Sequence, residues 1–311
     1  MREIVIVLYH HIAECNDSLI NQLAVSTKPD VFEKHVRYFA KNFDLVSATD
    51  LLSGSLPRRA LLVTFDDAYR SVLEIGAPIL STVKAPSLFF INPATVASST
   101  LPIDNVLSFG AEELGLTKVL SLLKVEHSKI SSTGQLIATI ISSMTKTEIV
   151  EAKQRIFSAV GVSEATIRSA SGLFLGPADI KALGRARIEV GNHSMSHLFL
   201  RSLSVNELKE EIAESRSVLE RLSGQTIKNF SVPYGNRHDA TDQVLNIARS
   251  SGHKAIFLVH AKSNRFRPAK DIYYRISLGN MSPERVPLEL LAMPILRSLR
   301  DLVQGTNHGR N

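Results

Sequence analysis

Two adjacent carboxylates, Asp66 and Asp67, directly follow the short apolar run LLVTF at 61–65. A run of this length is typical of a buried strand in an α/β protein. Groups that do chemistry in such folds lie at the carboxyl ends of strands. Two neighbouring carboxylates repel each other there unless a positive charge lies between them, and a divalent metal would supply it. One aspartate would then be a metal ligand and the other a base.

A pair of histidines, His193 and His197, has the spacing i, i+4 in the segment HSMSH. If the turn between them is helical, both imidazoles can hold one metal ion. Taken alone, a solvated pair is the better interpretation. However, the pair follows an apolar strand predicted over 187–190, so it also stands at a strand end. Asp67, His193 and His197 would together form a catalytic, zinc-type site with open positions for water.

Asp66 is then the predicted general base, because an unligated carboxylate beside the metal can take the proton of an activated water. The alternative is that both aspartates cap the following helix, where acids are favourable. Capping would explain one aspartate better than two.

The tripeptide Pro233-Tyr234-Gly235 follows a strand predicted over 229–232. Pro233 removes a backbone donor and Gly235 permits unusual dihedral angles, so the backbone between them is fixed. The N–H of Tyr234 is a candidate donor to an oxyanion, and all three residues are candidates for contact with substrate. A simple turn is the alternative interpretation.

The elements around these residues alternate between strand and helix, which predicts an α/β fold with a parallel sheet or barrel. Strands are predicted over 3–8, 43–46, 61–65, 87–91, 187–190, 229–232 and 255–259. Helices are predicted from Pro29, over 70–83, from Pro177 to Gly184, from the capping box at Ser204 to Gly224, and over 241–250. Residues from about 98 to 176 show helical periodicity and contain no catalytic motif. We therefore predict that they form a helical insertion that shapes access of the substrate to the site.

Together the motifs resemble those of the polysaccharide deacetylases of carbohydrate esterase family four, the NodB homology domain. Residues 64–67 are similar to the family's TFDD motif, 193–197 to its second motif and 233–235 to its third. The resemblance covers most of the chain outside the insertion. It implies a deformed (β/α) barrel, the metal and base positions given above, and hydrolysis of an N-acetylated sugar to a free amine and acetate.

The sequence departs from the family pattern at an arginine. The usual third motif has an arginine before the proline, whereas Ser231 and Val232 occupy that region here. A subgroup similar to the poly-N-acetylglucosamine deacetylases also lacks it. The arginine normally orients the base, and Arg275 is the candidate to replace it.

The general acid also departs from the common arrangement, a Leu-x-His near the C-terminus after a Trp-containing motif, since this chain has no tryptophan. In the poly-N-acetylglucosamine subgroup the histidine comes from the first strand instead. Leu8-Tyr9-His10 is similar to that arrangement, so His10 is predicted to protonate the leaving amine. His11 and His260 are the alternatives.

The composition is that of a soluble globular protein, with 311 residues of which 44% are hydrophobic and 21% charged. The single cysteine excludes an internal disulfide. No apolar run is long enough for a membrane span and no signal peptide is evident, so we expect a cytoplasmic protein with one catalytic domain over 1–311. The net charge of +6 is concentrated beyond residue 249, with a basic tail at about 283–311.

These features define the expected partners. The cofactor would be one divalent ion, Zn²⁺ first, with Ni²⁺, Co²⁺, Mn²⁺ or Fe²⁺ as alternatives. A cytoplasmic enzyme would meet a sugar precursor, and the basic end would suit a phosphate-linked substrate or an anionic membrane surface. Nucleic-acid binding is not expected, because few aromatic residues interleave the basic ones. Alternative functions are hydrolysis of a non-sugar amide or O-acetyl ester, or carbohydrate binding without catalysis.

Overall fold

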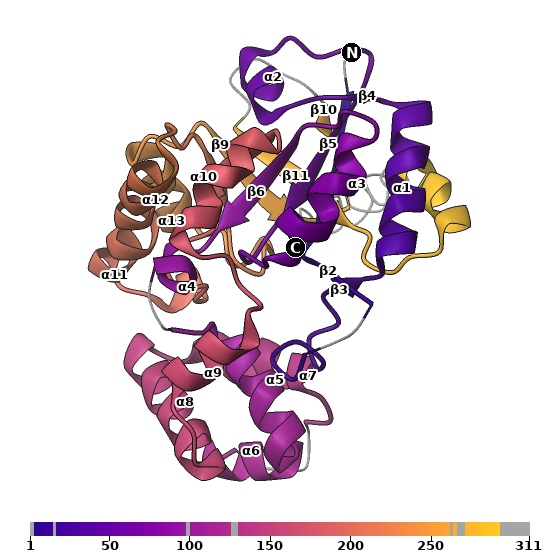
Figure 1. Ribbon diagram of the computed structural model, residues 1–311. Helices are drawn as coiled ribbons and strands as arrows, with labels where there is room; N and C mark the ends of the chain where they lie inside the picture. The colour runs from indigo at the N-terminus through magenta and orange to yellow at the C-terminus, as the bar shows by residue number, and fades with distance from the viewer. Residues whose placement is uncertain are drawn as a thin grey trace, which may run out of the picture.

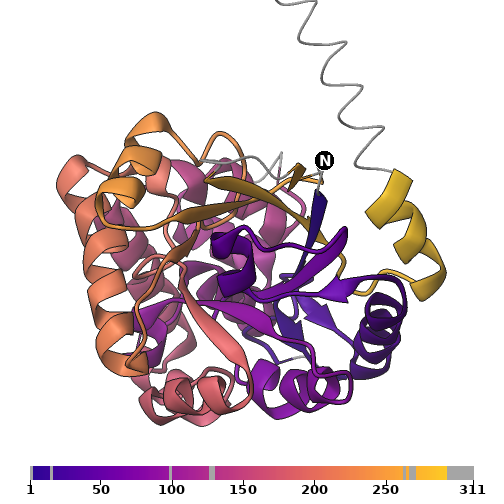
Figure 2. The same cartoon turned by 90° about the horizontal axis from the view of Figure 1, so that it is seen from above.

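The computed structural model describes residues 3–14, 17–97, 100–125, 130–261, 264–265 and 271–292. Within these residues, seven parallel strands close into a barrel (Figure 2). In spatial order they are β1 (Glu3–Tyr9), β5 (Arg59–Phe65), β6 (Ser87–Ile91), β7 (Ile188–Asn192), β8 (Asn229–Ser231), β9 (Ala255–Val259) and β11 (Ile272–Ser277). The ring closes because β1 pairs with both β5 and β11. The predicted deformed (β/α) barrel is confirmed.

Strands β1, β5, β6 and β9 are apolar on both faces, which explains their nearly continuous hydrophobic runs. Phe90 on β6 contacts Phe257 on β9 with ring centroids 5.0 Å apart, although these strands are not neighbours, so their cluster fills the barrel interior. Along each strand the side chains alternate in direction, so the residues between the interior ones point outward and pack against the surrounding helices. The interior cluster includes Ile4, Ile6, Leu62 and Leu88, and the outer cluster includes Val7, Leu61, Val63 and Phe89.

Helices cover the outside of the barrel. They are α1 (Pro29–Asn42), α2 (Ala48–Ser53), α3 (Ala77–Ser81), α10 (Pro177–Arg185), α11 (Val205–Lys209), α12 (Ser215–Ser223) and α13 (Asp242–Ser250), with π-helical turns η1 (Val72–Gly76) and η5 (Glu210–Glu214). Gly184 lies inside α10, so it does not end that helix as predicted. Helix α2 was not predicted. The short strands β2 (His11–Ile12), β3 (Ser26–Thr27), β4 (Asp44–Leu45) and β10 (Asn264–Arg265) complete the sheets.

Besides α10, several helices lie between β6 and β7 in the sequence, and all but the first of them pack at one end of the barrel (Figure 1). They are α4 (Pro93–Ala97), α5 (Ile103–Leu114), α6 (Leu116–Leu122), α7 (Thr133–Thr139), α8 (Lys146–Val160) and α9 (Glu164–Ser171). We call α5–α9 the cap. Helix α5 is buried from Ile103 to Gly110, including the polar residues Asp104 and Asn105. The helical character predicted for this stretch is confirmed.

The C-terminal tail is described only in its first part, which contains η6 (Pro283–Arg285) and η7 (Leu288–Ala292). The predictions for the rest of the tail, and for the cysteine at position 15, lie outside the described residues. Within the described part of the chain, no helix combines the length and hydrophobicity needed to cross a bilayer.

Candidate active site at the carboxyl end of the barrel

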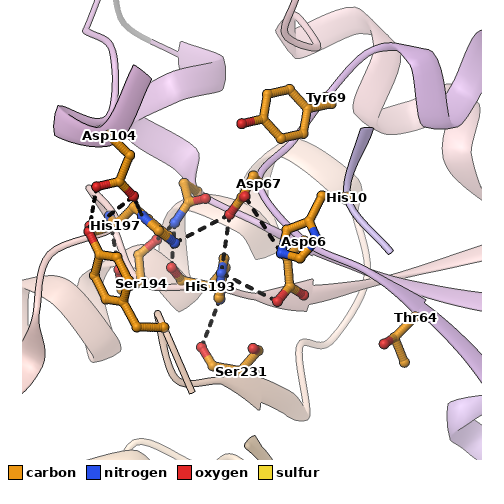
Figure 3. Close-up of polar contacts among 12 residues, drawn as sticks. His10, Thr64, Asp66, Asp67, Tyr69, Asp104, His193, Ser194, His197 and Ser231 are labelled. Atoms are coloured by element: carbon orange, nitrogen blue, oxygen red, sulfur yellow. Dashed lines mark hydrogen bonds and ion pairs between the residues drawn. The ribbon is translucent and has the colours of Figure 1, made fainter. Parts of the chain in front are cut away.

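Asp67, His193 and His197 meet where β5 and β7 end (Figure 3). Nε2 of His193 and Nε2 of His197 each lie 3.3 Å from Oδ1 of Asp67. One ligand atom of each residue lies within 4.8 Å of the other two, and all three residues are buried. The structure therefore brings together the three ligands predicted from the sequence.

The donor set suits a divalent cation. Nδ1 of His193 lies 2.9 Å from the carbonyl oxygen of Ser231, and Nδ1 of His197 lies 3.1 Å from Oδ2 of Asp104. These acceptors favour a proton on each Nδ1, so the lone pair of each Nε2 faces Asp67. Oδ1 of Asp67 is buried, and no group in the described part of the chain donates a hydrogen bond to it. Two imidazoles and one carboxylate directed at one point fit a catalytic zinc-type site.

The pKa values of Asp67 and His197 also indicate that this site favours a bound positive charge. Burial acts to raise the pKa of Asp67, but His197 and the other nearby imidazoles hold that pKa well below its usual range. Burial lowers the pKa of His197, while the carboxylates of Asp67 and Asp104 outweigh it and raise the pKa to about 9. The imidazole of His197 thus attracts either a proton or a metal ion.

The loop that carries the two histidines is not helical, and their imidazoles converge on Asp67 without the helical turn that their spacing would allow. Ser194 has φ 64° and His197 has φ 57°, both in the left-handed region. Such backbone persists only when its surroundings hold it. The side-chain amide of Asn92 donates to the carbonyl oxygen of His193, and the N–H of Ser196 donates to a carboxylate oxygen of Glu211 at 2.9 Å.

Asp66 is held by Arg275, which lies inside the barrel on β11. Nη1 and Nη2 of the guanidinium donate to Oδ1 and Oδ2 of Asp66, both at 2.7 Å, and the arginine is fully buried. Burial acts to raise the pKa of Asp66, but the guanidinium more than offsets it, so the pKa lies below its usual value. Nη2 also donates to Oγ of Ser231 at 2.7 Å. Ser231 thus helps to hold the guanidinium of Arg275 against Asp66.

Among the three candidate acids, the geometry favours His10. Nε2 of His10 lies 4.0 Å from Oδ2 of Asp67, and His10 lines the same cavity as Asp67, His193 and His197. Burial lowers its pKa, against the opposing effect of Asp67 and Asp66. His11 instead bonds Oγ of Ser26 at 3.0 Å, and the ring of His260 packs edge-on against Tyr274. Neither of those two histidines lines the cavity.

Tyr234 lines the cavity, and contacts hold both its ring and its hydroxyl group in place. Its ring stacks on Phe199 with centroids 3.5 Å apart, and its hydroxyl donates to Oδ1 of Asp104 at 2.9 Å. Gly235 has φ 69°, and a Cβ there would lie 2.5 Å from Cγ2 of Val259, so the turn requires glycine. Pro233 is buried beside it. Direct contact of Pro233 and Gly235 with substrate stays a prediction.

Sequence reasoning missed Asp104, which contacts both His197 and Tyr234 from the cap. It lies in the first turn of α5. An acid in that position is usually a favourable partner of the helix dipole, so its type and place gave no signal of a role in the site. Arg201 was also missed; it lines the cavity and pairs with the buried Asp239.

The sequence itself identifies the family. The family profile described as polysaccharide deacetylase matches residues 53–256, from just before β5 into β9. The chain belongs to the polysaccharide deacetylase family. The matched residues include Asp66, Asp67, His193, His197 and Tyr234. This polysaccharide deacetylase is therefore a carbohydrate deacetylase whose fold places these residues at one end of the barrel.

Solved structures similar to this polysaccharide deacetylase support the same fold. Streptococcus pyogenes deacetylase PplD, in complex with acetate, is 16% identical with a TM-score of 0.61, over 93% of this chain and 98% of that one. IcaB from Ammonifex degensii is 18% identical with a TM-score of 0.55, over 92% and 95%. A de-N-acetylase from Aggregatibacter actinomycetemcomitans is 14% identical with a TM-score of 0.55, over 91% and 96%. Comparison with curated proteins finds no match.

Proposed function

We propose that this protein is a metal-dependent hydrolase that removes the N-acetyl group of an N-acetylated sugar, giving a free amine and acetate. The observation that carries the proposal is the different surroundings of two adjacent carboxylates. Asp67 faces two imidazole nitrogens at 3.3 Å, whereas Asp66 is paired with Arg275 at 2.7 Å. One carboxylate is thus suited to be a ligand and the other to be a base, within a single catalytic domain.

Asp67, His193 and His197 would hold one divalent cation. Zn²⁺ is our first choice, because two imidazoles and one carboxylate form a common catalytic zinc site; Ni²⁺, Co²⁺, Mn²⁺ and Fe²⁺ accept similar ligands. When bound, the cation would polarise the acetamide carbonyl and make an attacking water more acidic. Asp104 would keep His197 in the required tautomer and orientation through the contact at Nδ1.

The protein's own groups would move the protons. Asp66, kept ionised and oriented by Arg275, takes a proton from the attacking water as its oxygen bonds the acetyl carbon. His10 in its protonated form donates to the amide nitrogen as the C–N bond breaks, and a lowered pKa makes it a stronger donor. The N–H of Tyr234 is proposed as a donor to the oxyanion, in a turn fixed by the anchored side chain.

A phosphate-linked precursor and contact with an anionic membrane surface are further proposals about the substrate's setting. They are supported by the basic residues beyond position 249. Vesicles with and without anionic lipid provide the test. Binding that requires anionic lipid and is lost on deletion of residues 283–311 is expected; binding unchanged by the deletion would count against the membrane contact.

Acetate release tests the reaction itself. The purified protein should release acetate from N-acetylglucosamine oligomers, lose this activity to a chelator, and regain it with added Zn²⁺ or another of the metals above. The Asp66→Asn variant is the matched control. Metal-loaded protein that hydrolyses an aryl acetate ester but no N-acetylated sugar would contradict the proposed substrate.

A further inference from the structure

The cavity in front of the metal ligands is small and has walls on several sides. Its volume is about 380 Å³. This value lies near the lower end of the range of roughly 300–1,000 Å³ found for small-molecule pockets. Six of the seven barrel strands, all except β6, contribute lining residues from their carboxyl ends or from the loops that follow. These residues include Leu8, His10, Asp67, His197, Val259 and Ser277.

The cap covers this cavity. The start of α5 contributes Asp104 and Asn105 to the lining, and α7 contributes Gly134, Ile137 and Ala138. The three residues of α7 are spaced i, i+3, i+4 and so share one face of the helix. Figure 1 shows the cap helices gathered at one end of the barrel, the end where β5 and β7 deliver the metal ligands.

Buried polar contacts fix the cap to the catalytic residues. Asp104 bonds the hydroxyl of Tyr234 and faces Nδ1 of His197. The side-chain amide of Asn105 donates to the hydroxyl of Tyr69 at 3.2 Å and to the carbonyl oxygen of Leu19 at 2.9 Å. Both residues are less than a tenth exposed. Because burial strengthens such contacts, the start of α5 is held in place over the site.

The charged groups of the lining suit a neutral ligand. Asp66 is neutralised by Arg275 and Arg201 by Asp239, and a divalent cation would balance the two remaining aspartates, Asp67 and Asp104. Asn105 and Asn236 add neutral polar groups that can bond sugar hydroxyls.

From the volume, the cap and the lining, we infer that the enzyme deacetylates a single N-acetylated sugar residue, either free or at the end of a larger molecule. A sugar within a polymer would need space on both sides of the metal ligands for its two neighbours. The cap, through Asp104, Ile137 and Ala138, and the strand-end loops line this cavity and so limit the space around the metal ligands. This inference rests on the proposed function and adds the substrate class to it.

Helix α7 provides variants that test the inference without disturbing the core. A Cβ added at Gly134 would have no atom within 4 Å, and Ala138 is exposed at the edge of the cavity. Gly134→Leu and Ala138→Phe should therefore fold and narrow the entrance. Thr139→Leu is the matched control, because Thr139 is exposed on the same helix and outside the lining.

The experiment uses metal-loaded full-length enzyme and N-acetylglucosamine chains of increasing length, the monosaccharide included. Mass spectrometry locates each free amine. At most one acetyl group should be lost per chain, from a terminal residue. Deacetylation of the monosaccharide would show that a free sugar is a substrate, whereas deacetylation of the longer chains alone would show that the enzyme requires a chain end. Gly134→Leu should lower kcat/KM about tenfold, and Thr139→Leu by no more than about twofold.

Loss of acetyl groups from internal residues of a long chain would overturn the inference but not the proposed function. A Gly134→Leu variant with the kcat/KM of the control would also overturn it. Release of no acetate from any N-acetylated sugar, by folded protein with metal bound, would instead refute the proposed function.

Discussion

Arg275 binds both carboxylate oxygens of Asp66 at 2.7 Å, although 209 positions separate the two residues in the sequence. They meet because β5 and β11 both pair with β1, which closes the barrel. The guanidinium also lies over the ring of Phe90, 5.1 Å from its centroid, and so fills the barrel interior beneath the site. The charge that keeps the proposed base ionised is thus part of the core of the fold.

Arg275→Lys should lower kcat at least about 100-fold, because a single ammonium cannot replace two parallel hydrogen bonds that fix the base. Arg275→Ala should in addition cost about 3–5 kcal/mol of stability, since it leaves a buried carboxylate unpaired. Acetate release and chemical denaturation measure the two effects. Metal content serves as the control and should stay unchanged in Arg275→Lys. A lysine variant with nearly full kcat would contradict the positioning role.

Asp66→Asn and His197→Ala should separate the base from the metal site. Asp66→Asn should keep the metal and lose about 100- to 10,000-fold in kcat, the usual contribution of a general base. His197→Ala should lose the metal, because a ligand is missing. Elemental analysis of the dialysed proteins, alongside acetate release, gives both readings. Near-normal turnover by Asp66→Asn would refute its assignment as base.

Asp104→Asn should weaken metal affinity about 10- to 100-fold, the usual effect of removing the charged partner of a metal-binding histidine. Tyr234→Phe should have a smaller effect on metal affinity, because the contact between Asp104 and His197 remains. Competition with a chelating dye measures the affinity. Glu113→Gln is the control, since Glu113 is an exposed acid on the same helix. Equal affinity in Asp104→Asn and Glu113→Gln would show that Asp104 does not support the ligand.

Stability should fall in acid through His253, a buried residue outside the site. Nδ1 of this histidine contacts the carbonyl oxygen of Ala248 at 3.0 Å, and Nε2 faces the side-chain amide of Asn192 at 3.2 Å, an arrangement that suits neutral imidazole. Burial lowers its pKa to about 4. Since the unfolded chain binds the proton at about pH 6.5, the free energy of unfolding should fall by about 3 kcal/mol between pH 6.5 and 4.

His253→Gln provides the comparison for this pH dependence, because glutamine can donate and accept in similar places without titrating. Denaturant unfolding at several pH values should give a flatter curve for the variant. Parallel curves for the two proteins would mean that other groups cause the acid sensitivity.

The sequence placed both aspartates and both histidines at strand ends, and the fold confirms those positions. It could do so because parallel strands buried on both faces leave long apolar runs that end abruptly in polar residues. Strand β11 escaped prediction because Arg275 interrupts its apolar pattern; a charged residue in a strand usually indicates exposure, whereas this one is fully buried against Asp66.

The local geometry of the site was harder to predict. The spacing of His193 and His197 lets both imidazoles reach one ion if the turn between them is helical, whereas the loop has left-handed backbone at Ser194 and at His197 itself. Positive φ is uncommon for serine and, although enriched, still infrequent for histidine, so the residue types alone do not predict this conformation. It depends on contacts made by Asn92 and Glu211, which are distant in sequence. Asp104 was missed for the same reason, because its partners become visible only once the cap is packed.

Closure of the barrel through β1 also sets an order of events during synthesis. The first barrel strand leaves the ribosome with one edge unpaired, and its second neighbour, β11, follows only after residue 271. Until then the nascent chain exposes the edges of both β1 and β9, which can pair with other chains. The carboxylate of Asp66 lacks the guanidinium of Arg275 during the same interval. Completion of the fold and completion of the catalytic centre therefore coincide in the last strand.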